Sequence, residues 1–153
     1  MKKIAMVCLV LFGVLGCQSD DKEEIVKEDS TPVAIEFETI KQGNLTNNLS
    51  VPGNYTLRTV DQWVDFQVTA NFFDDLRFDI DTYNVYEMFA VLDDVKETTG
   101  YSIEIKSISK VDGKLIVTVQ RYNPELGENI FNKVSQPYHI VKLRKTGLPV
   151  VFK

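Results

Sequence analysis

The sequence predicts an α+β domain in which one main α-helix packs against a mostly antiparallel β-sheet, arranged as a sandwich or half-barrel. Several short segments alternate apolar and polar residues, a pattern that is typical of half-buried strands. Asp112–Gly113 separates two of these segments and favours a tight hairpin turn, because such a turn needs positive φ. One longer segment instead repeats apolar residues at helical spacing.

Strands are predicted at intervals along the whole of the predicted domain. Residues 33–40 alternate, with Ile35 and Phe37 on one face, and Tyr55 and Leu57 form a short strand. Residues 42–53 are rich in Asn, Gly and Ser and are predicted to form a loop. Further strands are predicted at residues 85–92, 101–106, 114–122, 138–143 and 150–152.

One helix is predicted after Thr59, because Thr59 and Gln62 have the spacing of a capping box. Its apolar residues fall on a single stripe at i, i+3, i+7 and i+10: Trp63, Phe66, Ala70 and Phe73. A stripe of this kind predicts a buried core face rather than a cofactor site.

The first residues predict a lipoprotein signal. Residues 1–16 combine Lys2 and Lys3 with an apolar run that is too short to span a bilayer, and they end in Val14–Leu15–Gly16 before Cys17. This resembles the bacterial lipobox, so we expect cleavage before Cys17 and attachment of acyl chains to its thiol. A secreted chain without lipid is the alternative. Residues 17–32 are predicted to be an acidic linker, and residues 33–153 a single globular domain.

The acidic run after Cys17 resembles a signal that sends lipoproteins of some bacteria to the cell surface. We therefore expect an outer-membrane lipoprotein, exposed on the surface and held to the membrane through its N-terminal lipid. An ordinary solvated tether is the other interpretation of this run.

Composition and motifs argue against several classes of function. The formal net charge of −5, without a basic stripe, argues against a nucleic-acid partner. Because Cys8 leaves with the signal and Cys17 is lipidated, no thiol remains for catalysis or metal binding. His139 is the only histidine, and its place in an alternating strand predicts a structural role. We expect no enzyme activity, no catalytic residues, no metal site and no cofactor.

Four blocks in the second half of the chain occur in an order that resembles the C-terminal domain of the PrcB family. They are Thr99–Gly100–Tyr101–Ser102–Ile103–Glu104–Ile105, Asp112–Gly113–Lys114–Leu115–Ile116–Val117, Gln136–Pro137–Tyr138–His139–Ile140–Val141–Lys142 and Pro149–Val150–Val151–Phe152. The family is named for an accessory subunit of a surface protease complex. The resemblance therefore implies a non-catalytic binding or assembly subunit, whose partner is a secreted or surface protease or another surface protein.

Two loops are the candidate partner-binding site. The first holds Thr98, Thr99, Gly100 and Tyr101, and the second holds Asn123, Pro124, Glu125 and Gly127. We expect the loops to meet at one end of the sheet and form a binding edge, although a purely structural turn at Gly100 is an alternative.

A protease inhibitor is the second hypothesis for function, because residues 98–101 resemble part of the inhibitory loop of chagasin-type proteins. A third, an enzyme or a carbohydrate-binding protein, has no set of residues to support it.

Overall fold

The computed structural model describes residues 31–153 apart from residues 48, 73–77, 79 and 128. The predicted signal peptide, Cys17 and nearly all of the predicted linker lie outside the described residues, as does Phe73. The described elements form two four-stranded sheets and two helices.

The first sheet has the strand order β1-β5-β6-β8. Its strands are β1 (Val33–Ala34), β5 (Ser102–Val111), β6 (Lys114–Tyr122) and β8 (Val150–Phe152). All pairs are antiparallel except β6 with β8, which run parallel. Asp112 and Gly113 have φ of 47° and 69°, so the predicted hairpin turn between β5 and β6 is confirmed.

The second sheet has the order β2-β7-β4-β3 and is antiparallel throughout. Its strands are β2 (Glu38–Leu45), β3 (Gly53–Leu57), β4 (Tyr86–Leu92) and β7 (Gln136–Arg144). The two central strands, β4 and β7, are buried on both faces. This explains why residues 85–92 form an almost continuous apolar run rather than an alternating one.

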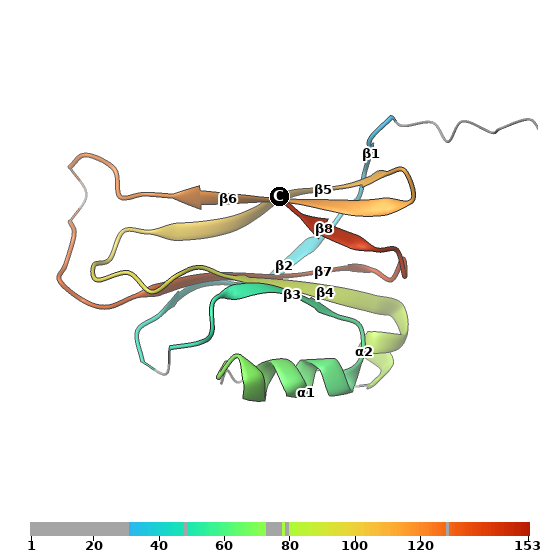
Figure 1. The fold of residues 1–153 in the computed structure, drawn as a ribbon, viewed down its shortest axis with the longest axis horizontal. Coiled ribbons are helices and arrows are strands. Elements are labelled where there is room, and N and C mark those ends of the chain that lie inside the picture. Colours follow the sequence, from blue (N-terminus) through green and yellow to red (C-terminus); the bar gives the residue numbers. More distant parts are fainter. Residues whose placement is uncertain (1–30, 48, 73–77, 79, 128) are drawn as a thin grey trace, which may run out of the picture.

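Helix α1 (Val60–Thr69) and the short α2 (Ile80–Val85) cover the outer face of the second sheet, so that the molecule has three layers (Figure 1). Thr59 caps α1 as predicted, because its Oγ1 accepts a hydrogen bond from the N–H of Gln62 at 3.1 Å. Trp63 and Phe66 are buried on the predicted stripe. The predicted α+β fold, mostly antiparallel with one main helix, is confirmed as a sandwich of two sheets.

Each interface between layers has its own core. Between the sheets, Phe89, Val117 and Val141 pack with neighbouring aliphatic side chains, and Phe89 meets the ring of Phe152 at a centroid distance of 5.9 Å. Between the second sheet and the helices lies an aromatic cluster: Trp63, Phe66, Phe72, Tyr83 and Tyr138.

Two predictions near the N-terminus, one strand and one loop, were wrong in their bounds. The predicted strand at residues 33–40 is divided, because the chain passes there from the first sheet to the second, and Ile35 and Phe37 fill the core at the crossing. Residues 42–45, predicted to be a loop, extend β2 by pairing with β7. β2 is an edge strand whose backbone pairs with β7 alone. Its residues are exposed or half-buried, so they can remain polar.

Candidate protein-binding surface at the loop end

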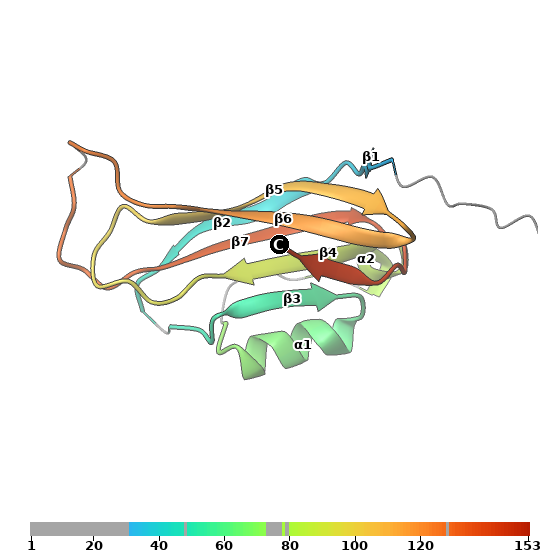
Figure 2. The same cartoon turned by 45° about the horizontal axis from the view of Figure 1, so that its top comes forward.

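Three connections lie together at one end of the sandwich, which we call the loop end (Figures 1 and 2). They are residues 46–52 between β2 and β3, residues 93–101 between β4 and β5, and residues 123–135 between β6 and β7. Pairing in the first sheet places Ser102 opposite Tyr122 at this end, whereas Val33 pairs with Lys110 beside the hairpin turn at the other end. The described chain therefore enters the domain at the end opposite the loops.

The base of the loop end is held by Gln136, which is fully buried at the start of β7. Its Oε1 accepts a hydrogen bond from the N–H of Ser50 at 2.7 Å. Its Nε2 donates to the carbonyl oxygens of Ser50 and Asp93, at 2.8 and 2.9 Å. One side-chain amide thus joins two connections to β7, and breaking these bonds would leave buried polar groups without partners.

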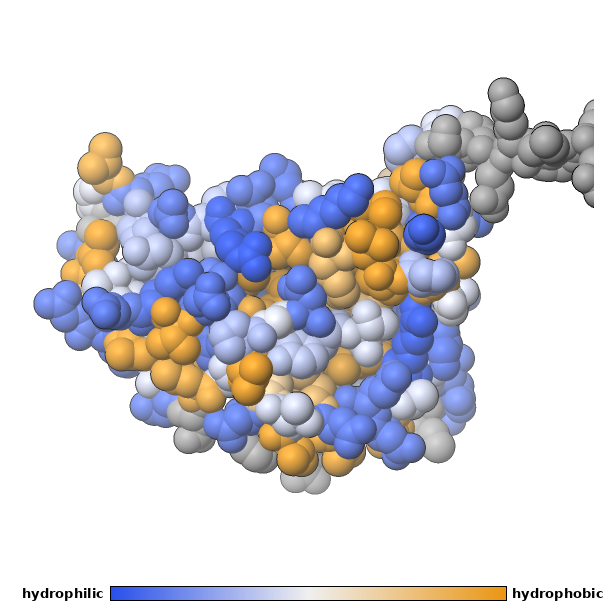
Figure 3. Space-filling view, viewed as in Figure 1, coloured by the Kyte–Doolittle hydropathy of each residue, from blue (hydrophilic) through white to orange (hydrophobic). Residues whose placement is uncertain are grey.

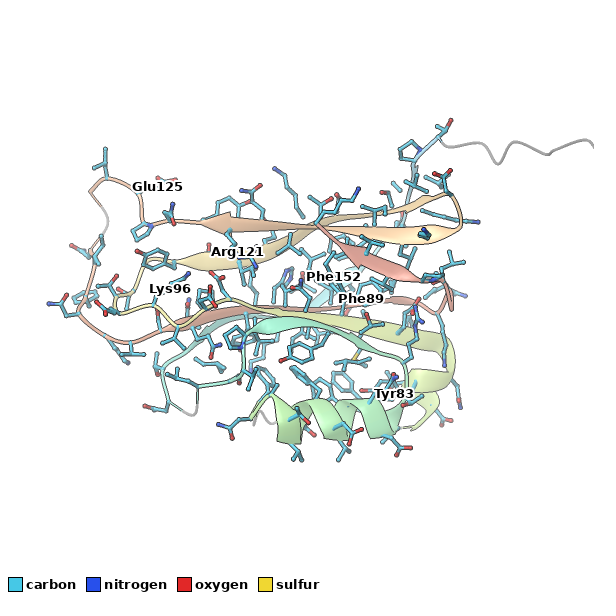
Figure 4. The ribbon with its side chains drawn as sticks, in the orientation of Figure 1. Tyr83, Phe89, Lys96, Arg121, Glu125 and Phe152 are labelled. Carbon is cyan, nitrogen blue, oxygen red and sulfur yellow. The ribbon has the colours of Figure 1, made fainter. Side chains whose placement is uncertain are left out.

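An ion-pair cluster closes the space between the sheets at the same end. Asp93 is almost fully buried, with its carboxylate 2.9 Å from Arg121 Nε and 3.2 Å from Lys96 Nζ. Burial raises the pKa of Asp93, but hydrogen bonds from Arg121, the backbone of Asp94 and Lys96 outweigh burial, so the pKa lies below its ordinary value. Figure 4 shows Lys96 and Arg121 between the two sheets.

The candidate residues Thr98 and Thr99 are attached to the connection between β6 and β7. The carbonyl of Thr98 accepts from the Ser135 hydroxyl at 2.8 Å. Thr99 donates its N–H to the carbonyl of Phe131 at 3.1 Å, and its Oγ1 accepts from the N–H of Phe131 at 3.0 Å. The two candidate loops therefore belong to connections that meet, but the hydrogen bonds described between these connections are made by Phe131 and Ser135.

Gly100 and Tyr101 complete the first candidate loop. Gly100 is exposed and has φ of 95°, so the expected turn with positive φ is confirmed. The half-buried Tyr101 ring lies 5.4 Å from Lys96 Nζ, an arrangement that favours a cation–π contact. This loop is a fixed platform whose exposed point is Gly100.

The second candidate loop projects further. Asn123, Glu125 and Gly127 are exposed and Pro124 is half-buried, and Figure 4 shows Glu125 at the outer side of the connection. Gly127 has φ of 98° and no neighbour within 4 Å of the place where a Cβ would stand. The loop is therefore free to approach another molecule closely.

The loop end also carries exposed apolar side chains, which we call the apolar loop surface: Val95, Leu126, Ile130, Phe131 and Val134. Leu126 is as exposed as in an unfolded chain, at 107%, and Phe131 is 64% exposed. Figure 3 shows hydrophobic residues on the same side of the molecule. Exposed apolar side chains at one end of a domain are typical of sites that bind another macromolecule, because complete burial of a fully exposed side chain such as Leu126 would release about 1.5–3 kcal/mol.

His139 has a structural role, as predicted. It is buried between the sheets, where Nδ1 accepts from the N–H of Ile105 at 2.9 Å and Nε2 lies 2.9 Å from Thr39 Oγ1. Because Nδ1 accepts, the neutral ring carries its proton on Nε2 and donates it to Thr39. Burial lowers the pKa of His139, although the carboxylate of Glu104 opposes this.

A buried carboxylate at the opposite end of the molecule is also fully engaged. Glu87 accepts from Arg58 Nε at 2.6 Å and from the N–H and hydroxyl of Thr146 at 2.8 and 2.6 Å. Arg58 Nη2 donates further to the carbonyl of Leu148. These bonds fix the connection that leads to β8, so Glu87 supports the fold.

Among the described residues, no group of three or more His, Cys, Asp or Glu side chains could hold a metal ion. Nor does this part of the chain contain a helix long and apolar enough to cross a membrane. A pocket of about 510 Å³ lies where residues 34–38 pass between the sheets, lined also by Tyr86 and by Lys142, which forms an ion pair of 3.1 Å with Glu38.

The described part of the chain is thus a sandwich that presents firmly held loops at one end, an arrangement typical of domains that bind other macromolecules through their loops. Residues 89–144 match the family model described as PrcB C-terminal, so the predicted resemblance to this family is confirmed for this segment. The matched segment runs from Phe89 in β4 to Arg144 at the end of β7 and includes two of the three loop-end connections. Searches of curated proteins and of solved structures found no match.

Gln136 and Phe131 were not among the residues predicted for the site. Gln136 opens a strand whose next residues are apolar, so nothing in the sequence marks it as a buried link between loops. Phe131 could have been found, because Leu126, Ile130, Phe131 and Val134 are apolar residues in a segment without the alternation of a strand.

Proposed function

We propose that this protein is a lipid-anchored, non-catalytic subunit that binds an exported protease or another surface protein through its loop end. The apolar loop surface is the observation that carries the proposal. The match of residues 89–144 to an accessory-type family supports a role in a protease complex.

The polarity of the molecule supports the proposed anchoring. Val33 lies at the end opposite the loops, so a lipid on Cys17 would be joined to the domain at the end away from the apolar loop surface. Two or three acyl chains hold a protein at a membrane almost permanently, at about 0.8 kcal/mol per buried methylene. We place the protein on the outer membrane, exposed at the cell surface. Labelled palmitate should enter the wild-type chain, and Cys17→Ser should abolish the labelling.

The test of binding is recovery of a partner from membranes in mild detergent. The tagged full-length chain should recover an exported protease or a large surface protein in stoichiometric amount. Leu126→Asp combined with Phe131→Asp should lower the affinity by at least about a hundredfold, because about 3 kcal/mol of apolar burial is lost.

Val64→Asp combined with Val68→Asp is the matched control. Both valines are exposed on α1 and are not part of the apolar loop surface, so this variant should bind as the wild type does. Recovery of no stoichiometric partner by the wild-type chain, or equal losses in the two variants, would contradict the proposal.

A protease inhibitor is the second candidate function, favoured by the fixed loop that exposes Gly100 at one end of a two-sheet sandwich. Solubilised full-length protein should then inhibit papain-like or subtilisin-like proteases, and Gly100→Trp should relieve the inhibition. Full protease activity at micromolar concentrations of the chain would exclude this function.

A further inference from the structure

One sheet edge, that of β3, is open along most of its length. β3 is the outermost strand of the second sheet and pairs with β4 alone. Asp93 donates its N–H to Pro137 in β7, so odd-numbered residues at this end of β4 direct their backbone groups to β7 and even-numbered ones direct theirs to β3. The β3–β4 register then directs the N–H and C=O groups of Asn54 and Thr56 outwards.

Arg58, the next residue whose backbone groups point outwards, confirms this alternation and marks the end of the open edge. Arg58 donates its N–H to Gln62 Oε1 at 2.7 Å instead of to a strand. Among the described residues, none forms a hydrogen bond with the backbone of Asn54 or Thr56 on the outer side. Four backbone groups are therefore available to an added strand.

Long parts of β5, β6 and β2 are protected in ways that β3 is not. On β5, the carbonyl of Ile103 accepts from Gln42 Nε2 and the N–H of Ile105 donates to His139, both at 2.9 Å. On β6, β8 and Lys153 cover the edge as far as Val119.

β2 has a bulge between Thr39 and Lys41 as well as charged side chains. Bulges, charges and covered edges prevent unwanted pairing of strands. β3 has none of these devices, and a groove lies directly beside it.

The groove lies between β3 and α1, which run side by side in Figures 1 and 2. It has a volume of about 240 Å³, and its floor is formed by Tyr55, Leu57 and Phe66. Gln62, Asp65 and Thr69 line its helical side, so its one charged residue is acidic. An edge strand beside a helix, with an apolar floor between them, is suited to recognise an extended peptide by strand addition.

We infer that an extended segment of a partner protein adds to the edge of β3, with an apolar side chain over Tyr55 and Phe66 and a basic side chain beside Asp65. The unpaired groups of Asn54 and Thr56 specify a strand as the occupant, and the carboxylate of Asp65 specifies the charge. A second copy of this chain fits less well, because edge-to-edge pairing of two copies brings two acidic grooves together. The inference goes beyond the proposed function, since this groove is separate from the apolar loop surface.

Amide hydrogen exchange of the free, isotope-labelled full chain tests the edge itself. The amides of Asn54 and Thr56 should exchange at least about tenfold faster than those of Tyr55 and Leu57, whose hydrogen bonds point to β4. Equal protection of all four amides would overturn the inference.

The probe for binding is a peptide selected on the chain from a displayed library of random decapeptides. The selected peptides should carry a Lys or Arg and should protect the amides of Asn54 and Thr56. Thr56→Pro removes an outward N–H and should weaken binding at least about tenfold, whereas Thr56→Ala should change it less than about twofold. Asp65→Lys leaves the backbone intact and should also weaken binding about tenfold, so the test survives if the proline variant does not fold.

Peptides that protect Phe131 instead, no selectable peptide, or a dimer in sedimentation experiments that Thr56→Pro dissociates would overturn the inference. Recovery of the membrane partner separates the two proposals. A partner lost with the Leu126/Phe131 variant but fully retained by Thr56→Pro and Asp65→Lys leaves the proposed function standing and removes β3 from that contact. A wild-type chain that recovers no partner contradicts the proposed function alone, because peptide binding at β3 is measured independently.

Discussion

Acidification below pH 6.5 should destabilise this chain through a single side chain, His139. The ring is buried, its Nδ1 already accepts a hydrogen bond from Ile105, and burial lowers its pKa below the usual 6.5. The unfolded chain therefore binds a proton at a higher pH than the folded chain does. Stability is complete above pH 6.5 and decreases as the pH falls from 6.5 to the lowered pKa of the folded state.

The size of this effect follows from one proton. A single group that is protonated only in the unfolded state lowers the free energy of unfolding by at most about 1.4 kcal/mol per pH unit. Because the chain has no other histidine, and carboxylates titrate mainly below about pH 5, this slope between about pH 6.5 and 5 belongs to His139. Glu104 moderates the slope, since its carboxylate favours the charged ring.

Urea unfolding at a series of pH values measures the slope, and His139→Asn is the control. Asparagine places Oδ1 at the position of Nδ1 and can accept from Ile105, but it does not titrate in this range. The variant should be less stable at neutral pH, because the bond to Thr39 is weakened, but its stability should stay constant down to about pH 5. Equal slopes for the two proteins, or a ring that titrates by NMR at or above 6.5, would refute the reasoning.

Two further predictions concern buried polar groups. Glu87→Ala should lower the free energy of unfolding by about 3–5 kcal/mol in urea, because it leaves Arg58 without its buried partner; Glu87→Gln should cost less, since its oxygen can still accept from Thr146, and equal costs would contradict this account. Gln136→Leu should cost about 2–4 kcal/mol and expose the amide of Ser50 to rapid hydrogen exchange. Unchanged protection of Ser50 would show that Gln136 does not hold the connection.

Much of the fold after Arg58 was predictable because its signals are local and agree with one another. The alternation of residues 114–122, the Asp112–Gly113 turn and the capping pair Thr59 and Gln62 each specify one conformation, and each was found where expected. The segment before Tyr55 was less predictable. Alternation such as that of residues 33–40 looks the same in either sheet, so the pattern cannot show that Ile35 and Phe37 lie where the chain changes sheet.

The position of the candidate site was predictable from the sequence, but the contacts that hold its loops were not. The turn signals at Gly100 and in residues 123–129 placed the two loops at strand ends. The contacts that hold them depend on pairs distant in sequence, such as Gln136 with Ser50 and Phe131 with Thr99. The spacing of apolar residues along the chain does not predict such distant pairs. The open edge of β3 was hidden for the same reason, because the order of strands in a sheet follows from packing rather than from the pattern of one strand.

The opposite positions of Val33 and the loop end also determine how the domain responds to force. A pull between the N-terminal residues and a protein held at the loop end acts along the strands of both sheets. The hydrogen bonds between β2 and β7 are then loaded together in shear rather than opened one after another. Lifetime under tension is governed by the rate of unfolding, so this orientation makes the domain mechanically durable even where its equilibrium stability is ordinary.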